Sequence, residues 1–537
     1  MAAQTNKDGA EAIEMENPPM TRPAVLADKL QDGDEALHIL QTDFVEYTPE
    51  EERRLRWKID LRLVTVMLIV NGIQFVDKLT ISYAATYGMI TEAHLKGQEF
   101  SLLITLFYIG YLVRIFSQCP PLSLEIDTSL QSQVAQYPTN YLMQRFPTGK
   151  YLTVNFVLWG ITLAATGSCK SFATLAPARF FLGVFESCLN PGFVLISSSW
   201  WKREEQAARI GLWYSANGLA SVPAGVLFWA IAHINVDNIF PYQWMFIIFG
   251  VLTVLVGASL WWMLPDTPLT CQWLSDRERV IAVQRLKDNR TGVKNTHHKK
   301  DQVIETLSDY RVWMLLLAIF CHNMTNSLQT NFTGIIIKGF GYNTYQAVLL
   351  QIPVGAIMAA TMILVGFFLS SKWGEGKVIF TIIACYIPGI ISCGILYGVP
   401  VNSSTLSSHL AAIFLIPIVA AAGGMMYSIL AANIAGYTKK TVTGTLFFSA
   451  YCVANIISPQ TFLAKQAPKY ATGVFVTLAA FIINIILFSI LYIVYSRENA
   501  ARRREMEDSG EIDEVSDLAN AFSDLTDRQN RRLIYKI

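Results

Sequence analysis

Apolar segments long enough to cross a lipid bilayer alternate with short polar segments along most of this chain. An α-helix needs roughly 20 apolar residues to cross about 30 Å of hydrocarbon. The segments that meet or approach this length are 61–84, 101–113 with a continuation at 137–143, 150–168, 173–197, 207–234, 243–264, 312–337, 345–370, 376–398, 409–432, 442–464 and 471–495. The pattern therefore predicts an all-α membrane protein with twelve transmembrane helices in two six-helix halves.

Longer polar segments set the expected boundaries of the two halves. We expect a disordered N-terminal tail at 1–55, a first half at 56–264, a linker at 265–310, a second half at 311–496 and a C-terminal tail at 497–537. Both tails are polar, and such composition is typical of segments without a packed core. Within the linker, Ser275 precedes mixed apolar and charged positions and is expected to cap a helix.

The distribution of basic residues predicts which side of the membrane each loop faces, because cytoplasmic loops carry an excess of Lys and Arg. Alternate loops of this chain are basic, and they hold Arg53, Arg54, Arg56, Lys58, Arg145, Lys150, Lys202, Arg203, Arg209, Arg277, Arg279, Arg285, Lys287, Lys299, Lys300, Lys372, Lys377, Lys439, Lys440, Arg497, Arg502, Arg503 and Arg504. The intervening loops are poor in basic residues, although 464–470 carries two lysines. Both termini and the linker are therefore expected on the cytoplasmic side of a multi-pass plasma-membrane protein.

One segment interrupts this pattern. The second predicted span loses its apolar character after Val113, where a polar, Pro-containing run covers 114–136. A helix of 101–113 alone is too short to cross a bilayer, whereas joining Val113 to Tyr137 would restore a span of ordinary length. Two interpretations remain open: a retained intron or gene-model error, or a genuine insertion that forms a re-entrant or peripheral loop.

The composition excludes several classes of protein. Of 537 residues, 52% are hydrophobic and 15% charged, which is too apolar for an ordinary soluble protein. A net charge of +1 gives no basic footprint for nucleic acid. The eight cysteines show neither a CxxC pair nor Cys/His ligand spacing, so no disulfide framework or zinc site is expected. The sequence lacks HExxH, an elbow-type GxSxG and a P-loop, which argues against an enzyme or an ATP-driven pump.

Four ionisable residues fall inside predicted spans of the first half: Asp77 and Lys78 in the first span, and Arg179 and Glu186 in the fourth. A charge at the bilayer centre costs about 2.5–3.5 kcal/mol on insertion scales, so such residues usually line a transport path. Arg179 and Glu186 are about two helical turns apart on one face, roughly 10 Å along the axis. Because this exceeds the reach of an i,i+4 pair, we expect each to have a partner on another helix.

Five segments carry more distinctive motifs. They are LRLVTVMLIVNGIQFVDKLTISYA (61–84), NYLMQRFPTGKYL (140–152), ARFFLGVFESCLNPGF (178–193), TGIIIKGFGYNTYQAVLLQIPVGA (333–356) and NIAGYTKKTVTGTLFFSAYCVANIISPQTF (433–462). Together with twelve helices in two halves, they resemble the major facilitator superfamily, and within it the fungal allantoate permease branch of the anion:cation symporter family. The resemblance covers roughly residues 55 to 497 without the insertion. It implies proton-coupled uptake of small organic anions such as allantoate, ureidosuccinate, nicotinate and related carboxylates.

The resemblance also implies roles for the four intramembrane charges. The family usually carries Asp-Arg where this chain has Asp77-Lys78, and an Arg and a Glu where it has Arg179 and Glu186. Proton coupling needs a carboxylate that changes protonation, for which Glu186 and Asp77 are the candidates. An anionic substrate needs a fixed positive charge, which we assign to Arg179 and secondly to Lys78. The alternative is a buried network that locks the first and fourth helices together.

Polar residues of other spans are candidates for reading substrate shape. They are Asn217 in the first half and Asn331, Gln351 and Asn455 in the second. Each of them is equally suited to a hydrogen bond between helices. The overall prediction is a secondary transporter, expected as a monomer in the lipid bilayer, without nucleic acid and with no cofactor beyond the proton as coupling ion. A nutrient sensor on a transporter scaffold, or a uniporter or exchanger on the same fold, are the alternatives.

Overall fold

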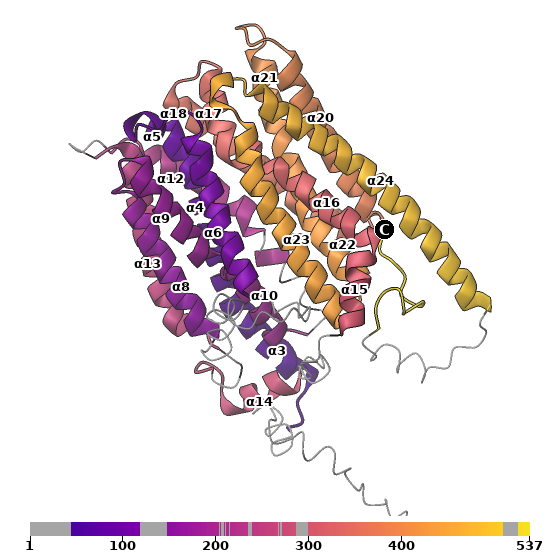
Figure 1. Ribbon diagram of the computed structural model, residues 1–537. Helices are drawn as coiled ribbons and strands as arrows, with labels where there is room; N and C mark the ends of the chain where they lie inside the picture. The colour runs from indigo at the N-terminus through magenta and orange to yellow at the C-terminus, as the bar shows by residue number, and fades with distance from the viewer. Residues whose placement is uncertain are drawn as a thin grey trace, which may run out of the picture.

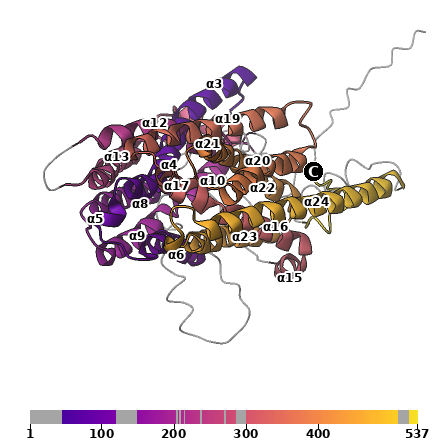
Figure 2. The same ribbon diagram turned by 90° about the horizontal axis from the view of Figure 1, so that it is seen from above.

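The computed structural model is built from helices that stand side by side in two groups (Figures 1 and 2). It describes residues 45–118, 148–285 apart from 203–204, 206–208, 210, 214, 235–238, 267 and 269–270, and then 299–508 and 525–537. The first group, indigo to magenta in Figure 1, belongs to the first half, and the second, pinkish red through orange to yellow, to the second half.

The first half begins with three consecutive helical segments that form one continuous helix over 49–86. Thr48 caps its start through a capping box with Glu51, which satisfies two free backbone N–H groups. The helices of this half are α3 (Pro49–Ile59), a π-helical turn (Asp60–Val64), α4 (Thr65–Thr86), α5 (Met89–Glu92), α6 (Glu99–Gln118), α8 (Thr148–Thr166), α9 (Phe172–Glu186), α10 (Leu189–Trp200), α12 (Ala216–Ile231) and α13 (Pro241–Met263).

The linker contributes two short helices, α14 (Asp276–Gln284) and α15 (Lys300–Ser308). Ser275 caps α14 by accepting a hydrogen bond from Glu278 N, which confirms the predicted cap. The helices of the second half are α16 (Tyr310–Met324), a π-helical segment (Ser327–Phe332), α17 (Thr333–Gly339), α18 (Thr344–Leu349), α19 (Gln351–Ser370), α20 (Val378–Gly398), α21 (Leu406–Leu415), a 3-10 turn (Ile416–Val419), α22 (Ala420–Asn433), α23 (Tyr437–Ile457), 3-10 turns at Ser458–Thr461 and Ala464–Gln466, and α24 (Ala471–Asp508).

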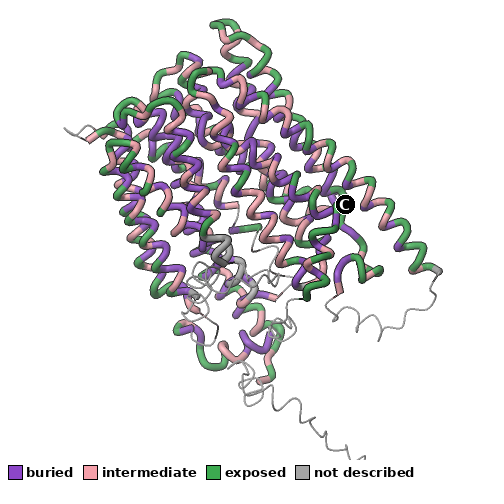
Figure 3. The backbone as a smooth tube through the Cα atoms, in the orientation of Figure 1, coloured by how far each residue is buried: buried purple, intermediate pink, exposed green. Residues whose placement is uncertain are grey.

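Each of the twelve predicted spans overlaps one of these helices or a run of them. Within the described residues, seven helices are long and apolar enough to cross a membrane. Large apolar side chains point outward from them, including Trp262 at 77% exposure and Phe367 at 73%, and exposed positions recur along α24 (Figure 3). Outward apolar side chains suit contact with lipid, because lipid offers polar groups no partner. The predicted all-α membrane fold is confirmed.

Three predicted span boundaries are wrong. The second span does not stop at Val113, because α6 continues through Arg114 to Gln118; the rest of the anomalous run and the continuation at 137–143 lie outside the described residues. The fourth span is divided into α9 and α10, with a break at Ser187 and Cys188. The last span exceeds its predicted end at 495, since α24 extends to Asp508.

The bundle has two ends, which we name by their contents (Figure 1). The linker end carries α3, α14 and α15, and the opposite end carries α5, α18 and α21. Towards the opposite end the halves contact each other directly. Lys338 Nζ donates to Thr86 O at 3.1 Å, and Gln460 Nε2 donates to Thr105 Oγ1 at 2.9 Å. The two halves are therefore joined towards the end that lies away from the linker.

Candidate transport site

An ion pair inside the bundle joins the first and fourth predicted spans. Lys78 Nζ of α4 lies 3.0 Å from Glu186 Oε1, at the last residue of α9. The Glu186 side chain is fully buried, whereas the Lys78 side chain keeps 21% of its surface exposed. The structure thus gives Glu186 the expected partner on another helix, and that partner is the more accessible member of the pair.

Gln74 binds the same carboxylate oxygen. Its Nε2 donates to Glu186 Oε1 at 2.9 Å, and its side chain is buried. Gln74 precedes Lys78 by one helical turn, so both side chains leave α4 on one face. Within the described residues, Glu186 Oε2 is buried without a hydrogen-bond partner. Gln74 is not among the site residues predicted from the sequence, although its i,i+4 spacing from Lys78 places it on the same helix face.

Asp77 points to a different side of α4. Its Oδ2 accepts a hydrogen bond of 2.7 Å from Trp159 Nε1 of α8, and its side chain is 2% exposed. Trp159 is itself completely buried. Adjacent residues on a helix diverge by about 100°, so Asp77 and Lys78 meet different neighbours. Asp77 therefore belongs to the interior of the first half, and Trp159 is a second partner that the sequence analysis missed.

Arg179 lies deep in the first half. Only 4% of the residue is exposed, and its guanidinium carbon sits 5.1 Å from the centre of the Phe246 ring on α13. In the described part of the chain, its Nε and Nη2 atoms make no hydrogen bond. Arg179 thus has a π-face partner on another helix, and it is less accessible than Lys78.

Two glycines bring α6 and α9 close enough to form this site. A Cβ atom on Gly183 would lie 2.0 Å from Phe107 O, and one on Gly110 would lie 2.2 Å from Phe180 O, so no side chain fits at either position. Small residues allow such close approach between membrane helices. The α9 helix then ends at Glu186, and Pro191 in the first turn of α10 has no backbone N–H to continue the ladder. The carboxylate therefore sits at a discontinuity of the helix.

The second half faces this region with amide and phenol groups. Asn326 Nδ2 donates to Asn455 Oδ1 at 2.7 Å and to Tyr108 Oη of α6 at 3.4 Å. Asn455 in turn donates to Asn323 Oδ1 at 3.4 Å. The Tyr108 ring also meets the Tyr451 ring edge-on at 6.1 Å. This amide cluster of Asn323, Asn326 and Asn455 is a contact between the two halves.

The α6 helix connects the ion pair to the amide cluster. Lys78 Nζ lies 5.9 Å from the centre of the Tyr111 ring, one turn after Tyr108. Lys78 of the first half therefore approaches Tyr111, and the amide of Asn326 in the second half contacts Tyr108 on the same helix.

The four predicted polar candidates are distributed unevenly. Asn455 belongs to the amide cluster described above. Asn217 accepts a 3.0 Å hydrogen bond from Asn71 of α4. Gln351 donates to its own helix turn at Ala347 O, 3.3 Å away, and Asn331 is buried in the π-helical segment. Among the described residues, none of Asn217, Gln351 and Asn331 is hydrogen-bonded to the amide cluster. Among the described residues no group of three His, Cys, Asp or Glu side chains has the geometry of a metal site.

Helices in two groups, with an ion pair buried between helices of one group, are typical of a membrane transporter. The Major Facilitator Superfamily matches residues 67–459, and the chain belongs to this superfamily. It is a transporter of that superfamily and not an enzyme.

Fungal transporters resemble the chain over nearly its whole length. It is 33% identical to the allantoate permease of Saccharomyces cerevisiae over 94% of this chain and 90% of that protein. It is 31% identical to the thiamine pathway transporter THI73 of the same yeast over 89% of this chain and 85% of that protein. The chain is therefore similar to an allantoate permease, the class of protein that the motifs indicate.

Solved structures with low sequence identity share the fold. The xylose symporter XylE with bound 6-bromo-6-deoxy-D-glucose matches with a TM-score of 0.60 and 12% identity, over 80% of this chain and 94% of that one. A bacterial homologue of the lysosomal transporter Spinster, described as inward-facing, matches with a TM-score of 0.54 and 15% identity, over 83% of this chain and 97% of that one.

Proposed function

We propose that this transporter couples the movement of a small organic anion, such as allantoate or a related carboxylate, to the movement of protons. The observation that carries the proposal is the ion pair between Lys78 and Glu186, in which a fully buried carboxylate meets a partly exposed cation. Ionisable groups are costly inside a membrane and usually mark a transport path. The similarity to the allantoate permease supports an anionic substrate.

The balance of the four charges at the site suggests how proton and anion movement are coupled. Asp77 and Glu186 offset Lys78 and Arg179, so the ionised site is neutral overall. A proton on Glu186 weakens its attraction for Lys78 and leaves the site with one positive charge. The freed ammonium group then binds the substrate carboxylate by a charge-assisted hydrogen bond. In this mechanism Lys78 replaces Arg179 as the first contact of the anion, because Arg179 is almost fully buried.

Arg179 then supplies a fixed charge behind the ion pair. Guanidinium groups do not lose their proton under physiological conditions, so Arg179 keeps the local balance positive when Glu186 is neutral. Asp77, held by Trp159, offsets this charge from the other side of α4. Asn455 and Asn326 would contact the uncharged part of the substrate from the second half.

Alternating access requires the halves to separate at one end while they meet at the other. Contacts towards the opposite end, such as Gln460 with Thr105, support a conformation that is closed there. With the termini and linker in the cytoplasm of a plasma-membrane protein, this arrangement is the inward-facing state. Substrate and proton would leave to the cytoplasm from it.

The test is uptake of labelled organic anions into liposomes that contain the purified protein, with and without an imposed proton gradient. The Glu186→Gln variant should lose gradient-driven accumulation but keep exchange of substrate across the membrane, because glutamine mimics the protonated side chain permanently. Normal concentrative uptake by this variant would remove Glu186 from the mechanism. Accumulation by the unaltered protein without a gradient would contradict proton coupling.

A further inference from the structure

The residues 525–537, which we call the strap, fold against the linker end of the second half. The sequence predicts only a polar tail in this region, yet three of the strap's side chains are almost fully enclosed. Thr526 has no exposed surface, Asp527 is 1% exposed and Tyr535 is 2% exposed. A segment with this degree of burial is a packed part of the fold.

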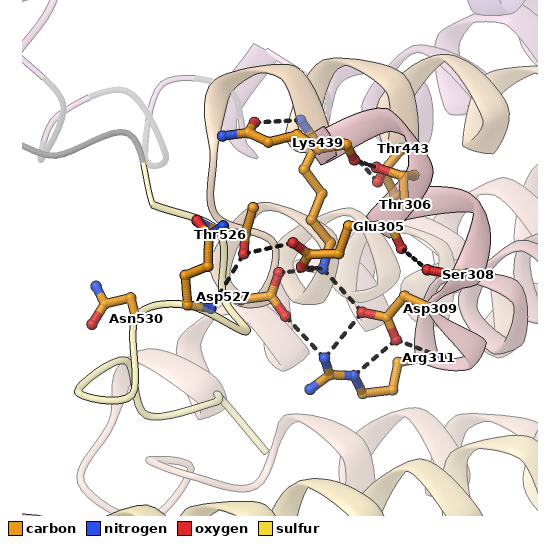
Figure 4. Close-up of polar contacts among 12 residues, drawn as sticks. Glu305, Thr306, Ser308, Asp309, Arg311, Lys439, Thr443, Thr526, Asp527 and Asn530 are labelled. Carbon is orange, nitrogen blue, oxygen red and sulfur yellow. Dashed lines mark hydrogen bonds and ion pairs between the residues drawn. The ribbon is translucent and has the colours of Figure 1, made fainter. Parts of the chain in front are cut away.

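Asp527 anchors the first part of the strap to two buried cations (Figure 4). Its Oδ1 lies 2.7 Å from Lys439 Nζ, and its Oδ2 lies 3.3 Å from Arg311 Nη2. Asp309 contacts the same two cations, at 3.0 Å each. Glu305 adds a third carboxylate at 2.9 Å from Lys439 Nζ. The Lys439 side chain has no exposed surface, so its charge is balanced by these carboxylates instead of by water.

Tyr535 anchors the other part of the strap. Its ring stacks on Tyr495 of α24 with centroids 4.8 Å apart, and its hydroxyl donates to Asp527 Oδ2 at 2.9 Å. The same hydroxyl accepts hydrogen bonds from Arg311 and Arg502. Asn499 pairs with both backbone groups of Tyr535, at 2.9 Å and 2.8 Å. The two anchors are thus bonded to one another as well as to the helices.

Further contacts between the strap and the helices are hydrogen bonds to the backbone of the strap. Arg502 Nη2 donates to Asp527 O at 2.7 Å, and Asn433 exchanges two hydrogen bonds with the backbone of Lys536. The first N–H of α20, on Val378, donates to Ile537 O at 3.2 Å. The partners of the strap in this network lie on α15, α16, α20, α22, α23 and α24, so one short segment touches several helices at the linker end of the second half.

We propose that this end of the second half is a docking surface for the strap, and that the docked strap braces the helices so that the half moves as one body. The occupant is a segment of the same chain, recognised by a carboxylate that enters between Lys439 and Arg311 and by a tyrosine that stacks on Tyr495. The strap is bonded to this surface mainly through polar groups, which makes it a separable unit. The proposal does not depend on which substrate the protein carries.

The experiment uses the full chain with a protease site inserted between Asp508 and Leu525. The purified, folded protein is cut in detergent and passed through a size-exclusion column. The strap should elute with the protein after the cut. In the double variant Asp527→Asn, Tyr535→Ala it should leave at least about ten times faster, because the buried cations lose a charged partner. Loss of the strap from the unaltered protein during the run would overturn the docking surface.

Two further variants distinguish the loss of an anchor from a general loss of stability. Arg528→Gln changes an exposed neighbour of Asp527 and should retain the strap like the unaltered protein. Tyr535→Phe removes only a hydroxyl and should release it at an intermediate rate, so this variant serves if the double variant does not fold. Equal retention by all variants would overturn the assigned anchors. Release of the strap should lower the midpoint of thermal unfolding by at least about 4 °C, and an unchanged midpoint would overturn the bracing role.

Discussion

Two ion pairs, one in each half of the transporter and at different heights in the bundle, differ in how far they are exposed. In the first half, Lys78 and Glu186 form an ion pair inside the membrane-spanning helices, and Lys78 keeps 21% of its side chain exposed. In the second half, Lys439 and Asp309 pair at the linker end, with exposures of 0% and 2%. At the level of the site the second half offers amides, such as Asn455, in place of charges.

Under the proposed mechanism, this difference separates charges that take part in transport from charges that hold the fold. Glu186 leaves one oxygen without a hydrogen-bond partner among the described residues, and Lys78 is partly exposed, so in that mechanism proton and substrate compete for the pair. Lys439 has three carboxylates around it and no exposed surface. A site that exchanges protons and substrate needs polar groups whose hydrogen bonds are incomplete. A structural cluster is stable because each of its charges is paired.

The largest effect is expected from removal of the accessible cation. Lys78→Met should reduce gradient-driven uptake by about a hundredfold, because truncation of one member of a buried charge pair costs about 2–5 kcal/mol. Lys78→Arg keeps the charge and should retain most of the uptake. Rates are measured in liposomes after the protein content has been matched. If Lys78→Met transports normally while Arg179→Met does not, the anion contact belongs to Arg179.

The corresponding change in the second half should affect stability before transport. Asp309→Asn leaves Lys439 and Arg311 with one carboxylate fewer and should lower the free energy of unfolding by about 3–5 kcal/mol. Thermal unfolding in detergent measures this loss. The control is Asp276→Asn, whose side chain is 98% exposed and which should be nearly neutral. An Asp309→Asn protein that is stable but does not transport would contradict the division between the halves.

The same cluster should respond to acid. Burial opposes ionisation of Asp309, but hydrogen bonds from Arg311 and Lys439 outweigh it and lower the pKa of Asp309 below its ordinary value. A lowered folded-state pKa means that the contribution is complete above the unfolded value, about 4, and is lost as the pH falls through the folded value. The unaltered protein should lose more stability than Asp309→Asn when the pH is lowered below about 4.

The sequence alone predicts the fold well and the site only in part. The twelve apolar segments can be predicted from their length. The four intramembrane charges, Glu186 and Lys78 among them, can be predicted because a charged residue stands out within an apolar segment. The break after Glu186 and the partners Gln74 and Trp159 depend on how helices pack, for which the sequence offers only the glycines and Pro191. The strap was missed because its anchors, Asp527 and Tyr535, are far from their partners in sequence and surrounded by polar residues.

A smaller effect is expected in the amide cluster of the second half. Asn455→Ala removes hydrogen bonds to Asn326 and Asn323, which are worth about 0.6 kcal/mol each between membrane helices. The apparent KM for the substrate should therefore rise by about threefold to tenfold, with little change in the maximal rate or in the pH profile. Asn331→Ala, at a buried position apart from this cluster, is the control. An altered pH profile in Asn455→Ala would place proton coupling in both halves.

The smallest effect is expected for an ion pair at the linker end of the first half that stays partly hydrated. Glu278 lies 2.7 Å from Lys58, with 29% of its side chain exposed. Burial opposes its ionisation, yet hydrogen bonds from Lys58 and the Ser275 backbone lower its pKa. Its contribution is therefore complete at neutral pH and is lost as the pH falls below about 4.3.

Because solvent screens this pair, Glu278→Gln should cost at most about 1 kcal/mol. Unfolding of the single variants Glu278→Gln and Lys58→Gln and of the double variant gives the coupling free energy directly. If the coupling free energy between Glu278 and Lys58 were as large as that between Asp309 and Lys439, the ion pairs at the linker ends of both halves would have the same structural role. The accessible pair of Lys78 and Glu186 would then be the feature that distinguishes the first half.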